Sequence, residues 1–331
     1  MSDEASASTP SVWSTLNLPK IFLGPAGEAI SRLIGRAADI PDAKIASHVQ
    51  KIKDDTAARS IVTKAIAEAV AKNAASDPVL VERAMESFVR KEFRKQENKE
   101  AVAQKTIEAL ADTTSDSHEQ TRPATPDADW MNVFESHAEK ASTERMRDIW
   151  GQVLAGEIRK PKSFSLKTLN FISQLDQRIA TLFEKYAKKV CFGDSIPKSH
   201  DLKGETLSEL LQLEEFGLVS NVAGTIARNP ILTPQDTGLL MTVGSGHLAL
   251  VRAPTKAPDA IAINVPVIPL TSVGREIYSI VLPRFDLEAA REIAKEFPKE
   301  NLSRISVFDS VSQTETEVLW EALAVVKEPK Q

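Results

Sequence analysis

The stretch from Asp129 to Leu175 contains the clearest helical pattern in the chain, and it constrains the fold more than any other feature. Its apolar residues recur every three or four positions, as on one face of a helix. A basic joint, residues 159–162, contains Pro161, which cannot continue a helix, and the apolar spacing begins again after it. We therefore expect two antiparallel helices that pack face to face. Their apolar positions are Trp130, Val133, Phe134, Ile149, Trp150, Val153, Leu154 and Ile158 in the first, and Leu166, Leu169, Ile172, Leu175, Ile179, Leu182 and Phe183 in the second.

Composition supports a mainly α protein. Aromatic residues make up 5% of the 331 residues and there are 13 glycines, which favours helices over a large sandwich or barrel. The net charge of -5 provides no overall basic field for nucleic acid. Cys191 is the single cysteine and cannot form an intrachain disulfide. Together with a polar N-terminus unlike a signal peptide and no apolar run of about 18 residues, this predicts a cytoplasmic protein.

The distribution of apolar residues predicts five regions. A disordered tail spans residues 1–15, and an N-terminal helical region spans 16–112, with helices at 42–73 and from Pro78 to about Leu110. Residues 113–129 have no large apolar residue and read as a flexible linker. A central helical pair spans 130–190. A small winged-helix-like α+β region spans 200–331, so the fold class is mainly α with a C-terminal α+β part.

An amphipathic stretch covers residues 16–40, where Gly24 and Pro25 begin a short helix. Its apolar face could pack on the protein's own core or on a second subunit. Alternatively, apolar residues flanked by basic ones suit a helix that lies on a membrane surface. The candidate membrane or partner surface consists of Phe22, Ile30, Leu33 and Ile34.

The C-terminal region has the order of elements found in winged-helix modules. A helix at 205–216 ends at Gly217, two strands at 239–243 and 247–252 flank a glycine turn, and a helix follows at 271–280. The first helix carries four glutamates and no lysine or arginine, and acidic residues repel phosphates. We therefore expect a protein-binding winged helix, with a DNA-binding regulator as the alternative. A helix at 286–297, a strand at 305–311 and a strand or helix at 315–324 complete the region.

No residue pattern in the chain predicts a reaction, a cofactor or a metal. Residues 192–196 resemble the Gly-Asp-Ser signature of a lipase and esterase family, but no Asp-x-x-His pair follows to supply the base. The five histidines are scattered without metal-ligand spacing, and no phosphate-binding loop is present. Glu144, Asp148 and Glu157 share one predicted helix, where acid–base work would require burial. Ion pairing on the helix surface is the simpler interpretation.

Two sets of motifs resemble known families. The Gly-Pro-Ala-Gly sequence at 24–27, the sequence at 150–158 and the segment at 165–176 are similar to the bacterial family called domain of unknown function 2806, from about Leu18 to Ala322. More distantly, the layout resembles the alpha-type abortive-infection proteins, which implies a role in defence against phage and no catalytic residues. The matching positions have packing or capping roles and are Gly24, Pro25, Trp150, Val153, Leu154, Ala155, Leu169, Ile172, Leu175, Asp176, Gly217, Leu218, Leu270, Thr271 and Gly274.

These observations favour a non-enzymatic bacterial protein that self-associates and acts in phage defence. We expect a homo-oligomer, with a further protein partner as an option and with little affinity for nucleic acid. The alternatives are the DNA-binding regulator, an effector that contacts the inner face of the membrane through residues 16–40, and an enzyme built on the three carboxylates. The expected role in phage defence rests on the resemblance to abortive-infection proteins, and analogy of fold alone does not establish function.

Overall fold

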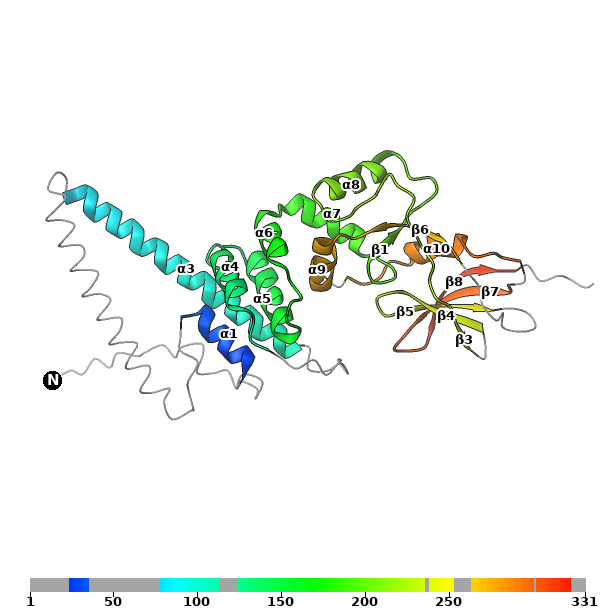
Figure 1. Cartoon of the computed structure of the whole chain (residues 1–331), viewed down its shortest axis with the longest axis horizontal. Coiled ribbons are helices and arrows are strands. Elements are labelled where there is room, and N and C mark those ends of the chain that lie inside the picture. The colour runs from blue at the N-terminus through cyan, green and yellow to red at the C-terminus, as the bar shows by residue number, and fades with distance from the viewer. Residues whose placement is uncertain are drawn as a thin grey trace, which may run out of the picture. The chain divides into compact units, whose positions relative to one another are not determined.

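The computed structural model describes residues 24–35, 78–112, 124–235, 238–252, 263–281, 283–300 and 302–322 (Figure 1). The chain divides into two compact units, Met1–Leu169 and Asn170–Gln331. This division falls inside the predicted central region 130–190. The predicted tail, the predicted helix at 42–73 and the linker up to residue 123 lie outside the described residues, as does Phe22.

The first unit is helical. It contains α1 (Pro25–Leu33), α3 (Pro78–Asp112), α4 (Ala128–Ala138) and α5 (Glu144–Arg159), and α6 (Leu166–Gln174) begins in it. The second half of α3 packs along α5, and α1 packs against both of them and against α4. Trp130 stacks on Phe134, and its indole nitrogen donates to the Phe164 carbonyl at 2.8 Å. Burying the large aromatic side chains in this way removes much apolar surface from water and stabilises the unit.

The predicted pair of helices is in fact four helices, because the chain breaks at 139–143 and again at 175–176. Thr143 caps the start of α5, where its hydroxyl oxygen accepts from the Met146 amide at 3.3 Å. Asp176 caps α7 (Gln177–Ala187), where its carboxylate accepts from the Ile179 amide at 2.8 Å. The prediction of two long helices was wrong because apolar periodicity runs through both breaks, whereas a side-chain cap starts a new helix.

The second unit contains a three-stranded antiparallel sheet in the order β1-β6-β2. Its strands are β1 (Ser195–Pro197), β2 (Ala227–Arg228) and β6 (Val265–Pro269). The helices of this part are α7, α8 (Gly204–Glu215) and α9 (Ser272–Val281). The central strand β6 buries Val265 and Val267. Strands β1 and β2 were not predicted, because strands of two or three residues are too short to show an alternating pattern.

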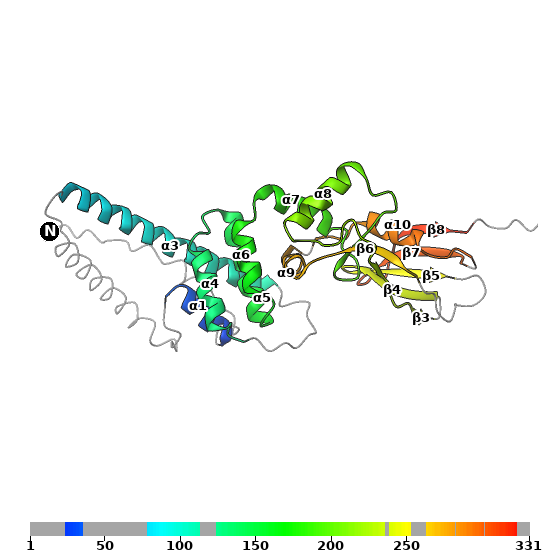
Figure 2. The ribbon, with the colours of Figure 1, turned by 45° about the horizontal axis from the view of Figure 1, so that its top comes forward.

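The same unit contains a five-stranded antiparallel sheet in the order β3-β4-β5-β7-β8. The strands are β3 (Thr233–Gln235), β4 (Gly238–Gly244), β5 (His247–Arg252), β7 (Arg304–Asp309) and β8 (Glu315–Glu321). Helix α10 (Leu287–Lys295) lies along this sheet (Figures 1 and 2). Ala290 and Ile293 of α10 join a core with Val251, Ile305 and Val307, so one face of the sheet is buried beneath this helix.

The predicted fold class, mainly α, is wrong. About 52% of the described residues are helical and about 18% lie in strands or bridges, distributed over the two sheets. The predicted hairpin is present as β4 and β5, but it lies inside the five-stranded sheet, where β5 also pairs with β7. It is therefore not the free wing of a winged helix. The error arose because a hairpin looks the same in sequence whether it stands alone or continues into a larger sheet.

Candidate functional surface

The N-terminal half of α3 is the most exposed apolar element in the first unit. Helix α3 enters the bundle near Gln96, whose amide donates to the Ile34 carbonyl at 3.1 Å. Before that point the helix projects away from α1, α4 and α5 in both ribbon views (Figures 1 and 2). Phe88 is 58% exposed and Phe93 is 73% exposed. Large exposed aromatic side chains on one element commonly mark an interaction site.

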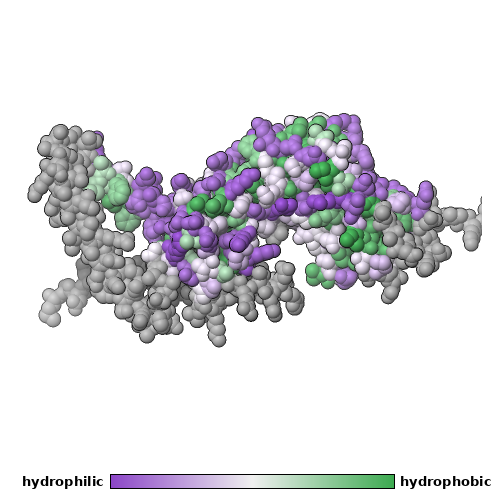
Figure 3. Space-filling model, viewed as in Figure 1, coloured by the Kyte–Doolittle hydropathy of each residue, from purple (hydrophilic) through white to green (hydrophobic). Residues whose placement is uncertain are grey.

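This exposed half continues the buried face of the same helix. Residues that lie 18 positions apart in an α-helix are separated by five turns and point in the same direction. Phe88 is therefore aligned with Thr106, which is fully buried. The other aligned pairs are Met85 with Ala103 and Val89 with Ile107. We call Met85, Phe88 and Val89 the α3 face; Phe93 lies on another side of the helix, aligned with the exposed Ala111. Hydrophobic residues also appear at the exposed start of α3 in Figure 3.

Two ion pairs beside the α3 face are made within the helix. Arg90 pairs with Glu86 at 2.7 Å, and Lys95 pairs with Glu92 at 2.9 Å. Such exposed pairs contribute little to stability but neutralise the charges beside the α3 face.

Two of the predicted acidic residues meet one lysine of α3. The Lys105 ammonium lies 2.8 Å from the Glu144 carboxylate and 3.0 Å from that of Asp148. Hydrogen bonding to Lys105 lowers the pKa of Glu144, and the hydrogen bonds that Lys105 donates to Glu144 and then to Asp148 raise the pKa of Lys105. A carboxylate whose ionised form is favoured is a poor general acid, and both carboxylates are exposed to solvent.

Glu157 does not join those two carboxylates. It is 3% exposed, and its carboxylate accepts from the Lys162 amide at 2.6 Å and from the Phe164 amide at 3.0 Å. It therefore holds the turn between α5 and α6 by satisfying backbone donors that would otherwise be buried without partners. The three predicted carboxylates form no shared site.

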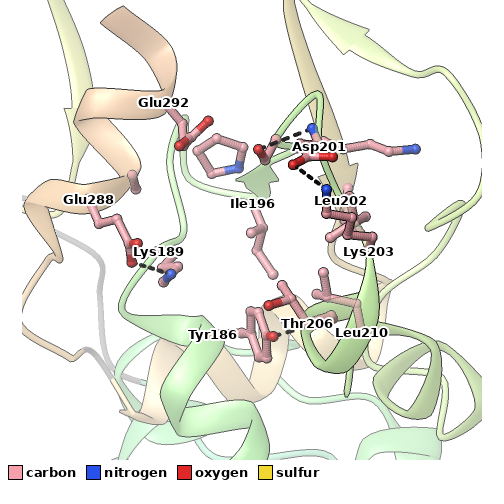
Figure 4. Close-up of a pocket in the computed structure, with 15 residues that line it drawn as sticks. Tyr186, Lys189, Ile196, Asp201, Leu202, Lys203, Thr206, Leu210, Glu288 and Glu292 are labelled. Atoms are coloured by element: carbon pink, nitrogen blue, oxygen red, sulfur yellow. Dashed lines mark hydrogen bonds and ion pairs between the residues drawn. The ribbon is translucent and has the colours of Figure 1, made fainter. Parts of the chain in front are cut away.

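A cavity of about 230 Å³ lies in the second unit between α7, β1, the start of α8 and α10. Lys189 and Glu288 point toward one another on one side, and Tyr186 and Thr206 line another (Figure 4). The charged groups that line it already have partners, as in the pairs Lys189–Glu288 and Lys203–Asp201. Lys198, for example, donates to the carbonyls of Val222 and Gly224. The cavity therefore presents few donors or acceptors to a ligand.

Near this cavity, Glu209 of α8 accepts hydrogen bonds from Lys185 at 2.6 Å and from the Tyr186 hydroxyl at 2.6 Å. The contact with Lys185, and then that with Tyr186, lowers the pKa of Glu209 below its usual value of 4.5. Burial, followed by the contact with Glu209, raises the pKa of Tyr186. The group of three joins α7 to α8.

These contacts predict a loss of stability in acid. Because the pKa of Glu209 is lower in the folded state, its ionised form stabilises the fold above pH 4.5, and this contribution disappears as the pH falls through the folded-state pKa. Urea unfolding at about pH 6 and pH 3 should show a smaller acid-induced loss for Glu209→Gln than for the wild type. Glu215→Gln, which removes an exposed carboxylate from the same helix, is the control and should behave like the wild type. Equal losses in all three proteins would contradict this assignment.

The Gly-Asp-Ser segment forms a tight turn. Ser195 is fully buried, and its hydroxyl donates to Asp194 at 2.7 Å and accepts from Arg228 at 3.3 Å. Arg228 also pairs with the Asp194 carboxylate at 2.6 Å. Neither of these hydrogen bonds of the Ser195 hydroxyl involves a histidine of the described chain. The contacts of this segment are therefore those of a turn, and they do not prepare Ser195 as a nucleophile.

The described histidines lie apart from one another. His137 stacks on Trp150 in the first unit, His200 pairs with Glu296, and His247 contacts the Ser245 carbonyl. Among residues with described positions, no group of three or more histidines, cysteines and acids could hold a metal ion. Burial raises the pKa of the Cys191 thiol, which keeps it protonated and unreactive.

The structure brings three family-motif residues of the second unit together. The Thr271 hydroxyl donates to the Gly217 carbonyl at 2.6 Å and accepts from the Gly274 amide at 3.0 Å. Gly217 has a φ of 77°, which favours glycine, and a Cβ at Gly274 would lie 2.0 Å from the Leu218 carbonyl oxygen. These residues therefore join the end of α8 to the start of α9.

The other motif residues are distributed over caps and cores. Pro25 follows the exposed Gly24 at the start of α1, and Leu175 is half-buried beside the cap Asp176. The remaining motif residues are buried and are Trp150, Val153, Leu154, Ala155, Leu169, Ile172, Leu218 and Leu270.

The apolar face of α1 packs within the first unit. Ile30 is 6% exposed and Leu33 is fully buried, while Ile34 is half-buried. Arg32 on the same helix donates to Asn132 at 2.8 Å and pairs with Glu135 of α4. This arrangement gives no support to a membrane role for these residues. None of the helices in the described ranges is both long enough and apolar enough to cross a bilayer.

The described chain is thus a helical unit followed by an α+β unit. A family model described as "Protein of unknown function (DUF2806)" matches residues 82–293, and the chain belongs to this family. The match confirms the resemblance noted in the sequence, but it begins inside α3, so Gly24 and Pro25 lie outside it. No curated protein and no solved structure matches the chain. The comparisons give no support to the more distant resemblance to abortive-infection proteins.

Proposed function

We propose that this protein is a non-enzymatic assembly protein that self-associates through the α3 face. The observation that carries the proposal is the alignment of exposed Phe88 with the buried face of the same helix. C-terminal to Gln96, the buried face of helix α3 packs against helix α5. Its exposed continuation has the same side-chain spacing and suits a second helix.

A second copy of the chain supplies such a helix. A twofold dimer brings the same patch of both subunits together, so an apolar patch is complementary to itself. The exposed half of α3 is roughly 25 Å long at 1.5 Å per residue, enough for several layers of side chains to interdigitate. The ion pairs Arg90–Glu86 and Lys95–Glu92 lower the electrostatic cost of bringing two such helices together.

The test is a substitution on the α3 face in the full chain. Replacing Phe88 with glutamate would bury a charge in the interface and should weaken dimerisation about 100-fold, as expected for a central aromatic contact worth about 3 kcal/mol. Light scattering after size-exclusion chromatography, over a range of protein concentrations, measures the change.

Two comparisons make this measurement decisive. Val311→Glu adds the same charge at a residue that is 90% exposed on a turn of the second unit, and it should leave the mass unchanged. Phe88→Leu keeps an apolar side chain and should still dimerise. A wild-type protein that is monomeric at every concentration, or a Phe88→Glu variant that dimerises normally, would rule the proposal out.

A role in phage defence rests only on the distant resemblance and is part of the same proposal. If assembly serves this role, a strain that carries Phe88→Glu should be infected as efficiently as a strain without the gene, in a plating assay with a panel of phages. Unchanged plating after deletion of the gene would remove this role. Neither the DNA-binding nor the membrane alternative is favoured by a particular contact, since α8 carries four glutamates and α1 buries its apolar face.

A further inference from the structure

Two arginines face each other on the five-stranded sheet of the second unit. Strands β5 and β7 pair Arg252 directly with Arg304. Their neighbours Val251 and Ile305 belong to the core under α10, so the two arginines lie on the opposite face of the sheet. Side chains that are directly opposite have Cβ atoms about 5 Å apart, and like charges in such a pair repel each other. The pairing is therefore unfavourable unless anions lie nearby, and Glu315 and Glu321 of β8 supply them on the Arg304 side.

The same position contains three polar atoms without partners. The Nε atoms of Arg252 and Arg304 are buried and make no hydrogen bond, and the same holds for the Ser306 hydroxyl. Ser306 is fully buried and lies two residues after Arg304, which places it on the same face of the sheet. Buried donors in folded proteins are almost always matched by an acceptor. Here three donors at neighbouring positions lack an acceptor.

The two carboxylates near this position both pair with the same arginine. Arg304 pairs with Glu315 and Glu321 of β8. Arg252 lies within ion-pair distance of no carboxylate in the described part of the chain. Leu250, on the same face, is 7% exposed and keeps water from one side of the group. A low local dielectric strengthens the attraction between a guanidinium and an anion.

We propose that Arg252, Arg304 and Ser306 form a binding site for a phosphate-type oxyanion, either free phosphate or the phosphate of a small monoester. The guanidinium group has a planar set of donors that matches phosphate oxygens, and a hydroxyl donates from a third direction. A tetrahedral oxyanion offers acceptors toward all three side chains. Arg304 is held by Glu315 and Glu321, whereas the Arg252 guanidinium ends a long side chain without an ion pair in the described chain and can turn to admit the anion beside Ser306.

The test is the binding of inorganic phosphate to the full chain, measured by titration calorimetry at constant ionic strength. Arg252→Gln and Ser306→Ala should each weaken binding tenfold or more. Arg284→Gln is the matched control, because it removes the same charge from an exposed arginine of the same unit, and it should bind as the wild type does. Ser306→Ala should also melt at a higher temperature than the wild type without phosphate, because it removes a buried hydroxyl that has no partner.

Further measurements identify the ligand class. A phosphate monoester such as glycerol phosphate is titrated beside inorganic phosphate, and the tighter of the two indicates the source of the anion. Acetate should not compete. Equal binding by all four proteins would show general charge attraction, and acetate that competes as well as phosphate would show a carboxylate site. Either result, or no binding to the wild type, would overturn the proposal. The self-association of the α3 face is measured separately and does not affect this outcome.

Discussion

Replacing Trp150 with alanine should lower the free energy of unfolding by about 3–5 kcal/mol, the usual cost of removing a buried tryptophan. Trp150 is 1% exposed. Its ring meets Phe134 edge-on at 5.6 Å and stacks on His137 at 5.3 Å. Removing it would leave a cavity between α4 and α5 that the surrounding aromatic rings can close only in part. Urea unfolding followed by circular dichroism measures the loss.

Trp320→Ala is the comparison for this prediction. Trp320 lies on β8 and is only half-buried against the core of the second unit. Its removal should cost about 1–2 kcal/mol, because less apolar surface is lost from the folded state. Amide hydrogen exchange should show faster opening of α4 and α5 in Trp150→Ala and not in Trp320→Ala. A Trp150→Ala protein as stable as the wild type would show that this aromatic group does not hold the first unit together.

Replacing Gly151 with valine should cost about 3 kcal/mol or more, because the side chain would force two packed helices apart. A Cβ built at Gly151 of α5 lies 2.5 Å from the Cβ of Lys105 and 2.8 Å from its backbone carbon in α3. Backbone atoms of a long helix cannot move independently of the helix. The valine should therefore lower the urea midpoint and reduce protection of α3 from hydrogen exchange.

Replacing each of two glycines of α5 with alanine gives a matched pair of variants. Glycine to alanine within a helix normally stabilises by about 0.5–1 kcal/mol. At Gly156 the added Cβ would meet the edge of the Phe164 ring, which can shift, whereas at Gly151 it would meet the α3 backbone. Gly151→Ala should consequently be the less stable of the two. The opposite order would show that α3 and α5 can separate at little cost.

For the two proposed surfaces, the sequence predicted the helices and strands but not which other parts of the chain cover them or pair with them. The sequence predicted both α1 and α3 as helices and placed Ile30 on an apolar face, yet only the structure shows that Ile30 is buried and Phe88 is exposed. The spacing of apolar residues is the same whether another element covers the face or not. The pairing of Arg252 with Arg304 had no signal at all, because it depends on the register of two strands about 50 residues apart in the chain.

The sequence by itself determined the features that act over a few residues. Pro78 begins α3, Asp286 caps α10, Gly217 ends α8, and the glycine turn between β4 and β5 makes a hairpin. Caps and turns depend on neighbouring backbone groups, so their residue types are informative without the rest of the fold.

Only the tertiary structure decided which strands share a sheet and which apolar faces are covered. Ser195 of β1 pairs with Pro269 of β6, although the two are far apart in sequence, and neither strand has a pattern of its own. The hairpin of β4 and β5 joined β7 and β8 because its apolar face, with Val251, packs with Ile305 beneath α10. Burying that shared apolar surface favours one large sheet over an isolated hairpin, which is marginally stable in water.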